Sequence, residues 1–323
     1  MHSLGIFAAP RKPGAGELAL QLALLAEARG IAVLMQSASA RQINREDLAC
    51  DADDDIAACD VLVTLGGDGA VLIAARAAAR HNTPVLAIDL GRLGFLSAVR
   101  PTEIERAFDM LLRGELIIEE RMMLDARVLR QGSGLRGQDL GEYAAAQNDH
   151  LESPSLNPKP QTLNPAVIGG SIGLNDAVVA KSALARILHL SIYVDGQMMA
   201  ETRSDGLIIS TPTGSTAYAL SAGGPIVHPA VPLLLICPIC AHSLAQRPLV
   251  VGPDEPIEVH AEWEGDEVAS SQLEAMLTID GQVGVPLQQG DVVRVRRAEC
   301  VARLLHLPND NFYDRLRQKM HWS

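Results

Sequence analysis

The sequence predicts an α/β domain followed by a β-rich domain, and three observations lead to this fold class. Up to about residue 120, apolar strand-like runs alternate with helical periodicities, which is typical of a parallel sheet covered by helices. Beyond that point long helical periodicities disappear and short strand-like runs follow one another. Two Asp-Gly pairs, at 195–196 and 280–281, each separate such runs, and this dipeptide is a strong hairpin signal. We therefore expect a Rossmann-like parallel N-terminal domain and a mainly antiparallel C-terminal domain.

In the N-terminal half, buried strands alternate with helices whose apolar residues recur at helical spacing. The expected strands are 4–9, 31–35, 60–65 and 83–90, and the expected helices are 17–30, 70–82 and 101–113. The acidic run at 51–55 is interpreted as a solvated loop.

In the C-terminal half, β-branched and apolar residues gather in short runs. The expected strands are 122–130, 188–194, 206–211, 233–239, 256–262, 275–279 and 292–298. Residues 131–168 are rich in Gly, Ser, Asn, Gln and Pro, which predicts a flexible surface insertion. The predicted organisation is a domain at 1–120, a domain at 121–305, and a helical tail at 306–323 whose aromatic residues pack back on the body.

The composition narrows the classes of function. The chain has 323 residues, 48% of them hydrophobic, and a formal net charge of −12. Nucleic-acid and anionic-membrane surfaces need fields of Lys and Arg, so neither partner is expected. No run approaches the ~18 apolar residues of a membrane-spanning helix, and no secretory signal is evident. The chain has five cysteines. This odd number, without a secretory signal, fits a protein of the reducing cytoplasm better than a framework of disulfide bonds.

A Gly-Gly-Asp-Gly turn stands between the strand at 60–65 and the following helix. Glycine allows a positive φ at such a turn and leaves backbone N–H groups uncovered. A helix N-terminus adds partial positive charge, so Gly66, Gly67 and Gly69 are candidates for a phosphate-binding loop. Asp68 could then act as a general base toward a hydroxyl or hold a metal ion. The alternative is an ordinary turn in which Asp68 caps the helix.

A dense block of hydroxyl and glycine residues follows the strand at 206–211. It runs Ser-Thr-Pro-Thr-Gly-Ser-Thr-Ala-Tyr at 210–218, preceded by Arg203 and Asp205. Hydroxyls and exposed amides suit sugar and phosphate oxygens, and the Tyr218 ring suits stacking on a planar base. The alternative, an ordinary Ser/Thr-rich loop, is hard to sustain over so long a run.

A third stretch, Leu174-Asn175-Asp176, enters a strand. It is either a simple Asx-turn or a pair of polar groups offered to a ribose or an adenine. Cys237 and Cys240 have metal-knuckle spacing, but nothing completes a set of four ligands, so we expect two buried thiols and no metal site. His228 and His242 stay without an assigned role.

These stretches together resemble the NAD kinase family over nearly the whole chain outside 131–168. The Thr-Pro-Thr-Gly-Ser-Thr-Ala-Tyr block is the most specific part, whereas lipid kinases and phosphofructokinases also carry Gly-Gly-Asp-Gly. The resemblance extends to Gly-Arg-Leu-Gly-Phe-Leu at 91–96, Pro-Ile-Cys-Ala-His-Ser-Leu at 238–244 and Arg-Pro-Leu-Val at 247–250.

The resemblance implies phosphorylation of the adenosine 2′-hydroxyl of NAD, which gives NADP. It implies ATP or polyphosphate as the donor, a divalent ion (Mg²⁺ or Mn²⁺) that accompanies the donor, and a homodimer or homotetramer. Asp68 would accept the hydroxyl proton. The residues implied in NAD binding are Asp68, Gly69, Asn175, Asp176, Arg186, Arg203, Asp205, Thr216, Ala217, Tyr218, Ala219, Leu220, Ser221 and Gln282.

Two residues depart from the family pattern. Ala70 stands where Thr or another small polar residue is frequent, which affects how the donor phosphate is held. Asp89 stands where Asn is commoner, and it either caps a turn or disturbs the nucleotide pocket. Two other functions stay open: a lipid kinase of the diacylglycerol type, which needs a large apolar acyl pocket, and a non-catalytic dinucleotide sensor, which has no need of Asp68.

Overall fold

The computed structural model describes residues 1–9, 12–91, 94–130, 165–182, 187–241, 246–263 and 275–322. Most of the insertion predicted at 131–168 therefore lies outside the described residues, as do Arg186 and His242. The end of that predicted insertion is wrong, because residues 166–168 already belong to a strand, β7 (Ala166–Gly173), which pairs with β6 (Ile117–Arg130).

The N-terminal half is the parallel α/β unit that the alternation predicts. Its strands pair in the order β3-β2-β1-β4-β5, and every pairing among them is parallel. The strands are β1 (Ser3–Ala8), β2 (Ala32–Gln36), β3 (Ala49–Cys50), β4 (Val61–Gly66) and β5 (Pro84–Asp89), and the helices are α1 (Ala15–Glu27), α2 (Ser37–Gln42), α3 (Asp53–Ala57), α4 (Asp68–Ala78) and α5 (Ile104–Leu112).

Residues 51–55 are exposed, as expected of a solvated segment, but they are not all loop, because α3 begins at Asp53. Three aspartates in its first turn suit the positive end of the helix dipole. Ile56 and Ala57 at its end are fully buried, and this burial holds the short helix against the sheet.

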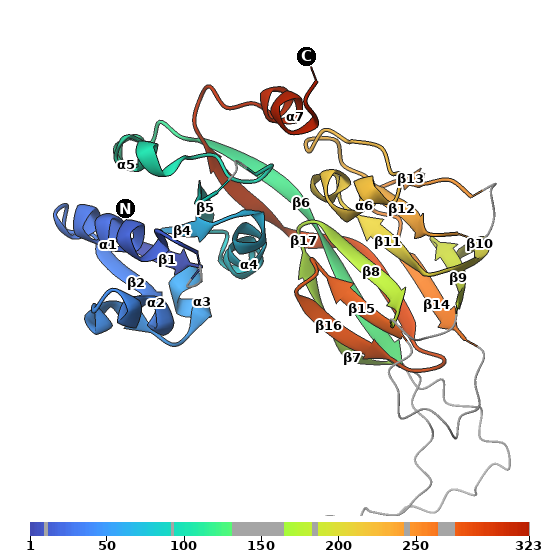
Figure 1. Ribbon diagram of the computed structural model, residues 1–323. Coiled ribbons are helices and arrows are strands. Elements are labelled where there is room, and N and C mark those ends of the chain that lie inside the picture. The colour runs from blue at the N-terminus through green and yellow to red at the C-terminus, as the bar shows by residue number, and fades with distance from the viewer. Residues whose placement is uncertain are drawn as a thin grey trace, which may run out of the picture.

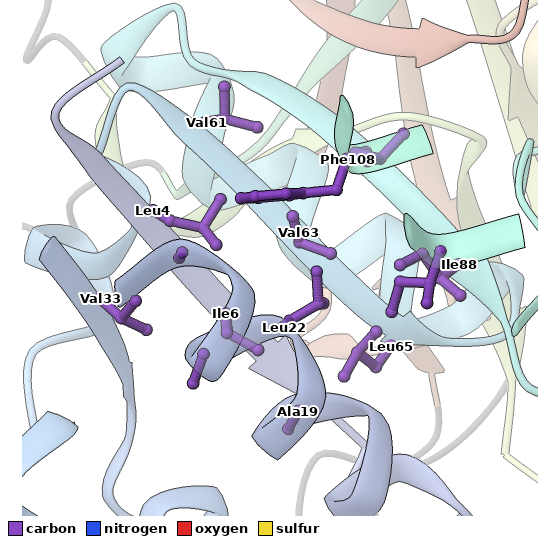
Figure 2. Packing of buried hydrophobic residues seen from close by; sticks show 14 of the residues in the cluster. Leu4, Ile6, Ala19, Leu22, Val33, Val61, Val63, Leu65, Ile88 and Phe108 are labelled. Carbon is purple, nitrogen blue, oxygen red and sulfur yellow. The ribbon is translucent and has the colours of Figure 1, made fainter. Parts of the chain in front are cut away.

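Helices cover both faces of this sheet. Alternate residues of β1 and β4 face α1 and α5, where Leu22 and Phe108 complete a buried apolar cluster (Figure 2). The residues between them face α4, whose Val71, Leu72 and Ala75 pack on the opposite side. This two-sided burial fixes the position of α4, and with it the Gly-Gly-Asp-Gly turn at its start.

The C-terminal half contributes strands to two sheets. The first sheet continues from β5 through the long strand β17 (Val292–His306) to β14 (Ile257–Glu262), β9 (Leu188–Val194) and β10 (Gln197–Ser204). The second is wholly antiparallel, and its order is β13 (Leu249–Val251), β12 (Leu234–Ile239), β11 (Gly206–Ser210), β8 (Asp176–Lys181), β15 (Ala275–Ile279) and β16 (Val283–Leu287). The expected antiparallel C-terminal half is confirmed.

β6 and β17 run side by side through the middle of the molecule and join its two halves (Figure 1). The end of β17 pairs parallel with β5, whereas its beginning pairs antiparallel with β14. The expected domain boundary at residue 120 falls within β6 and stays a prediction. Between the two sheets, residues such as Leu124, Leu277 and Val293 form a second core.

Both Asp-Gly pairs form hairpin turns, as predicted. Asp195 and Gly196 join β9 to β10, and Asp280 and Gly281 join β15 to β16; all four residues have positive φ. The chain ends in α7 (Phe312–Met320), where Asn311 caps the helix by accepting from the Asp314 N–H at 2.9 Å. Among the described residues, no helix combines the length and the apolar character needed to cross a membrane.

Candidate active site

The Gly-Gly-Asp-Gly turn joins β4 to α4, with Gly67 at the N-cap and Asp68 as the first helical residue. The described part of the chain includes Gly66, Gly67 and Gly69, and none of the three has a positive φ. Gly66 is required by packing instead, because a Cβ there would lie 2.5 Å from the Cβ of Ala70. Gly67 has open space where a side chain would stand. The first turn of a helix also leaves N–H groups without intrahelical acceptors.

The carboxylate of Asp68 is held by a neighbouring loop. Its Oδ2 accepts from the Phe95 N–H at 2.9 Å, and its Oδ1 accepts from the Leu96 N–H at 3.2 Å. The alternative in which Asp68 caps its own helix is wrong, since the start of α4 has no side-chain cap. A Cβ at Gly94 would lie 1.8 Å from Oδ1, so only glycine leaves room for this carboxylate.

The carboxylate of Asp89 also binds this loop. It is 4% exposed, and its two oxygens accept from the Gly91 N–H at 2.8 Å and the Gly94 N–H at 2.7 Å. Asp89 was expected either to cap a turn or to disturb the nucleotide pocket. The structure shows that it caps the turn.

A cavity of about 360 Å³ opens on the second sheet. Four predicted residues line it: Asn175, Asp176, Ala217 and Tyr218. The other residues that line it were not predicted; they are Val178, Ala180, Thr278, Asp280 and Gly281.

Asp280 organises one wall of this cavity. It accepts from the N–H groups of Leu174 at 2.9 Å, Asn175 at 2.7 Å and Asp176 at 3.2 Å. From the sequence, Asp280 was predicted only as part of an Asp-Gly hairpin turn. Nothing in the neighbouring sequence indicates which groups its carboxylate will bind. The structure thus shows that the Asn175–Asp176 segment is shaped by a carboxylate about a hundred residues away.

The two aspartates share a low-dielectric site. Burial, and then the negative charge of Asp280, raise the pKa of Asp176 to about 7. Burial also raises the pKa of Asp280, although the three N–H donors and Arg76 act in the opposite direction. Asp176 is therefore protonated in a substantial fraction of molecules near neutral pH, and a protonated carboxyl can donate as well as accept a hydrogen bond.

The hydroxyl-rich block packs directly on the same segment. Thr211 Oγ1 donates to the Leu174 carbonyl at 2.6 Å, and its N–H donates to the Asn175 carbonyl at 2.9 Å. A Cβ at Gly214 would lie 2.1 Å from that Asn175 oxygen. Several hydroxyls bond within the block itself, such as Ser215 to the Pro212 carbonyl at 2.6 Å and Thr216 to the Thr213 carbonyl at 3.2 Å. These hydroxyls shape the wall on which Ala217 and Tyr218 stand.

The remaining predicted binding residues are spread around this wall. Ala219 is fully buried under it and, like Thr216, Leu220 and Ser221, is not among the residues that line the cavity. Asp205 forms an ion pair with Lys181 at 2.8 Å. Arg203 stands on the exposed side of β10.

Gln282 and Arg76 link the cavity to the Gly-Gly-Asp-Gly turn. Gln282 Nε2 donates to the Gly69 carbonyl at 2.7 Å, and Arg76 Nη2 donates to Gln282 Oε1 at 2.8 Å. Arg76 Nη1 lies 3.7 Å from Asp280 Oδ2. The start of α4 is thereby held against the turn that closes the cavity, although the two are more than 200 residues apart.

The prediction of two buried thiols has a mixed outcome. Cys237 is buried as expected, but Cys240 is exposed, because it lies just beyond the end of β12 at a positive φ. His228 packs against the rings of Phe312 and Tyr313 in α7, with ring centroids 5.0 and 5.6 Å away. Within the described ranges, no three His, Cys, Asp or Glu side chains gather closely enough to form a metal site.

Comparison with known proteins gives a consistent answer. A family model described as the ATP-NAD kinase N-terminal domain matches residues 4–116, and one described as the ATP-NAD kinase C-terminal domain matches residues 174–307. An NAD kinase of Symbiobacterium thermophilum is 40% identical over 91% of this chain and 90% of its own length. An NAD kinase of Moorella thermoacetica is 38% identical over 99% of this chain and 89% of its own length.

Two solved structures share the fold. The yeast NADH kinase complexed with NADH has a TM-score of 0.78 at 25% identity and covers 100% of this chain and 88% of its own. An NAD kinase from Archaeoglobus fulgidus in complex with ATP has a TM-score of 0.68 at 21% identity, with 99% of each chain covered. With a cavity of about 360 Å³, a Gly-Gly-Asp-Gly turn beside it, and relatives of this identity and coverage, the chain belongs to the NAD kinase family, whose enzymes phosphorylate NAD.

Proposed function

We propose that the chain transfers a phosphoryl group from ATP to the 2′-hydroxyl of the adenosine ribose of NAD, and that Asp68 accepts the hydroxyl proton. One observation carries this proposal. The Asp68 turn is held beside the cavity by the bond from Gln282 to the Gly69 carbonyl, so a carboxylate and a helix N-terminus lie next to a space of about 360 Å³.

The reaction needs a proton acceptor because a ribose hydroxyl is a poor nucleophile near neutral pH. The 2′-oxygen forms a bond to the γ-phosphorus, the bond from that phosphorus to the bridging oxygen breaks, and ADP leaves. Each Asp68 oxygen accepts one backbone N–H and keeps a further lone pair for the hydroxyl. The partial positive charge at the start of α4 suits the phosphate that moves.

The dinucleotide is proposed to bind along the second sheet. Asn175, Asp176, Ala217 and Tyr218 line the cavity and would contact it, with the exposed Tyr218 ring available to stack on a base. Arg203 and Asp205 would bind toward the pyridine-nucleotide end, as the family resemblance suggests. The relatives are NAD kinases, so they do not support the alternatives of a lipid kinase or a dinucleotide sensor.

The donor is proposed to arrive as a complex with Mg²⁺ or Mn²⁺, which is part of the substrate. Mg²⁺ is held by one or two carboxylates together with substrate phosphates rather than by an all-protein cage. We further propose a cytoplasmic homo-oligomer; its five free cysteines suit a reducing compartment.

A coupled assay tests the proposal. Purified protein is incubated with NAD, ATP and Mg²⁺, and NADP is read through an NADP-specific dehydrogenase. We expect NADP formation that stops when ATP is omitted or EDTA is added. Parallel reactions replace ATP with polyphosphate, or NAD with diacylglycerol. Phosphorylation of the lipid alone, or NAD binding without NADP from either donor, would overturn the proposal.

The Asp68→Asn variant tests the assigned base. Asparagine keeps the shape of the side chain but has a single acceptor oxygen, so it keeps only one of the two backbone N–H bonds and cannot take the proton. Turnover is therefore expected to fall by about 10²–10⁴-fold. The dissociation constant of NAD, measured by calorimetry, should change only a few-fold. Asp254→Asn, at an exposed carboxylate, is the control. Near-normal turnover in Asp68→Asn would reject Asp68 as the proton acceptor.

A further inference from the structure

The C-terminal helix α7 contacts the loop that holds Asp68. Arg315 of α7 is only 4% exposed, and its Nη1 donates to the Phe95 carbonyl at 3.1 Å. Phe95 is the residue whose N–H donates to Asp68 Oδ2. One residue of the loop thus bonds to Asp68 through its N–H and to Arg315 through its carbonyl.

Arg315 is itself fixed by a partly buried charged cluster. Its guanidinium lies 3.5 Å from Asp310 and 3.9 Å from Glu119 of β6. Glu119 accepts from Arg121 at 2.8 Å and lies 2.9 Å from His306 of β17. The cluster therefore binds α7 to the two strands that join the halves of the molecule (Figure 1).

The same cluster extends toward the other wall of the site. Arg121 is 3% exposed, and its Nη1 lies 3.4 Å from the hydroxyl of Thr213 in the hydroxyl-rich block. His228 packs on the rings of Phe312 and Tyr313 at the start of α7, and the N–H of the neighbouring Val227 donates to Ser215 of that block at 3.0 Å. α7 is thus attached both to the Asp68 loop and to the segment that follows the hydroxyl-rich block.

We propose that Arg315 is a positioning residue: by holding the Phe95 carbonyl, it fixes the two N–H groups that orient the Asp68 carboxylate. This inference rests on the proposed role of Asp68 as the proton acceptor. A carboxylate can take the hydroxyl proton only from the correct direction, and small misplacements at a reacting centre are costly. The tail consequently serves the chemical step rather than the binding of NAD.

Arg315→Met tests the inference, because it keeps the buried alkyl stem and removes the donor. We expect kcat to fall on the order of 10- to 100-fold, while the dissociation constant of NAD changes less than about 3-fold, since Arg315 does not line the cavity. Arg317→Met in the same helix is the matched control, because Arg317 is 60% exposed and pairs with Asp314. It should leave both quantities unchanged.

A double-mutant cycle separates positioning from a general structural role. Rates of phosphoryl transfer are measured in single turnovers with enzyme in excess over NAD. If Arg315 acts through Asp68, Arg315→Met has no further effect in an Asp68→Asn background. Equal losses in both backgrounds, an unchanged kcat in Arg315→Met, or a loss confined to NAD affinity would each overturn the inference.

Arg315→Lys covers the case in which the Met variant fails to fold. Lysine keeps the positive charge beside Asp310 and Glu119 but lacks the fork that reaches both the carbonyl and the carboxylates. A folded Lys variant with reduced kcat and normal NAD affinity supports the inference, and unfolding of both variants overturns it in favour of a purely structural role. Normal turnover of Asp68→Asn would instead overturn the role of Asp68 itself, whatever the Arg315 variants do.

Discussion

At the scale of single residues, three aspartates of the site have the same carboxyl group and different surroundings. Asp68 accepts two backbone N–H groups, Asp280 accepts three, and Asp176 faces the negative charge of Asp280 in a buried position. The surroundings of Asp176, rather than its residue type, raise its pKa to about 7.

The raised pKa of Asp176 predicts a pH-dependent stability. Its pKa is about 7 in the folded protein and 3.8 as an unperturbed group. Between those pH values the folded state therefore binds more protons than the unfolded state. The free energy of unfolding should therefore fall as pH rises from about 4 to about 7. Asp176→Asn should remove this contribution and be more stable than the parent at pH 8, by roughly 2–4 kcal/mol.

Urea unfolding at pH 5 and pH 8 measures this effect, with Asp254→Asn as the exposed control. An Asp176→Asn variant with the same pH dependence as the parent would contradict the assignment.

At the scale of elements, α4 and the β15–β16 hairpin are joined by Arg76. Burial lowers the pKa of Arg76, while the neighbouring Asp280 acts in the opposite direction. The guanidinium is the cation beside a fully buried carboxylate side chain, and it also donates to Gln282. Removal of the cation leaves Asp280 with its backbone donors alone.

Arg76→Met is expected to lower the free energy of unfolding by about 1–3 kcal/mol, because a buried charge loses its partner. Denaturant unfolding at pH 7 provides the measurement. Arg80→Met, at an exposed position just beyond the end of α4, is the matched control and should change stability by less than about 0.5 kcal/mol. Equal effects of the two substitutions would mean that the link across the cavity contributes nothing.

At the scale of the whole molecule, the charged cluster around Glu119 holds the tail to both halves. Burial alone raises the pKa of Glu119, but the hydrogen bond with His306 and the charge of Arg121 lower it to about 2. A depressed carboxyl pKa contributes stability above its ordinary value of 4.5, and that stability is lost as pH falls toward about 2.

Glu119→Gln should accordingly lower the free energy of unfolding at pH 7 by about 1–3 kcal/mol and lose less stability than the parent below pH 4.5. Urea unfolding across pH 3–7 tests this prediction. Glu120→Gln is the control, since the neighbouring Glu120 is 64% exposed and lies 3.8 Å from Arg303. Parallel stability curves for the parent and Glu119→Gln would refute it.

Much of the fold could be predicted because its signals are local. The strands at 188–194 and 275–279 have the predicted bounds, and both Asp-Gly turns form hairpins. The short helix α3 was not predicted, because an acidic run is typical of a solvent-exposed loop. Only the structure shows that the last two residues of this helix are buried. For the site, Asn175, Asp176, Ala217 and Tyr218 were found through the motifs, whereas Asp280 was missed as a cavity residue.

The sequence by itself determined the alternation of strands and helices, the hairpin turns and the family motifs, because periodicity and turn chemistry act between residues close in the chain. Only the tertiary structure decided which motifs meet. Asp68 is held by residues 27 and 28 positions away, Asn175 by one 105 positions away, and Phe95 by one 220 positions away. Contacts at such separations depend on strand order and on the packing of α4 and α7, and neither leaves a periodic mark in the sequence.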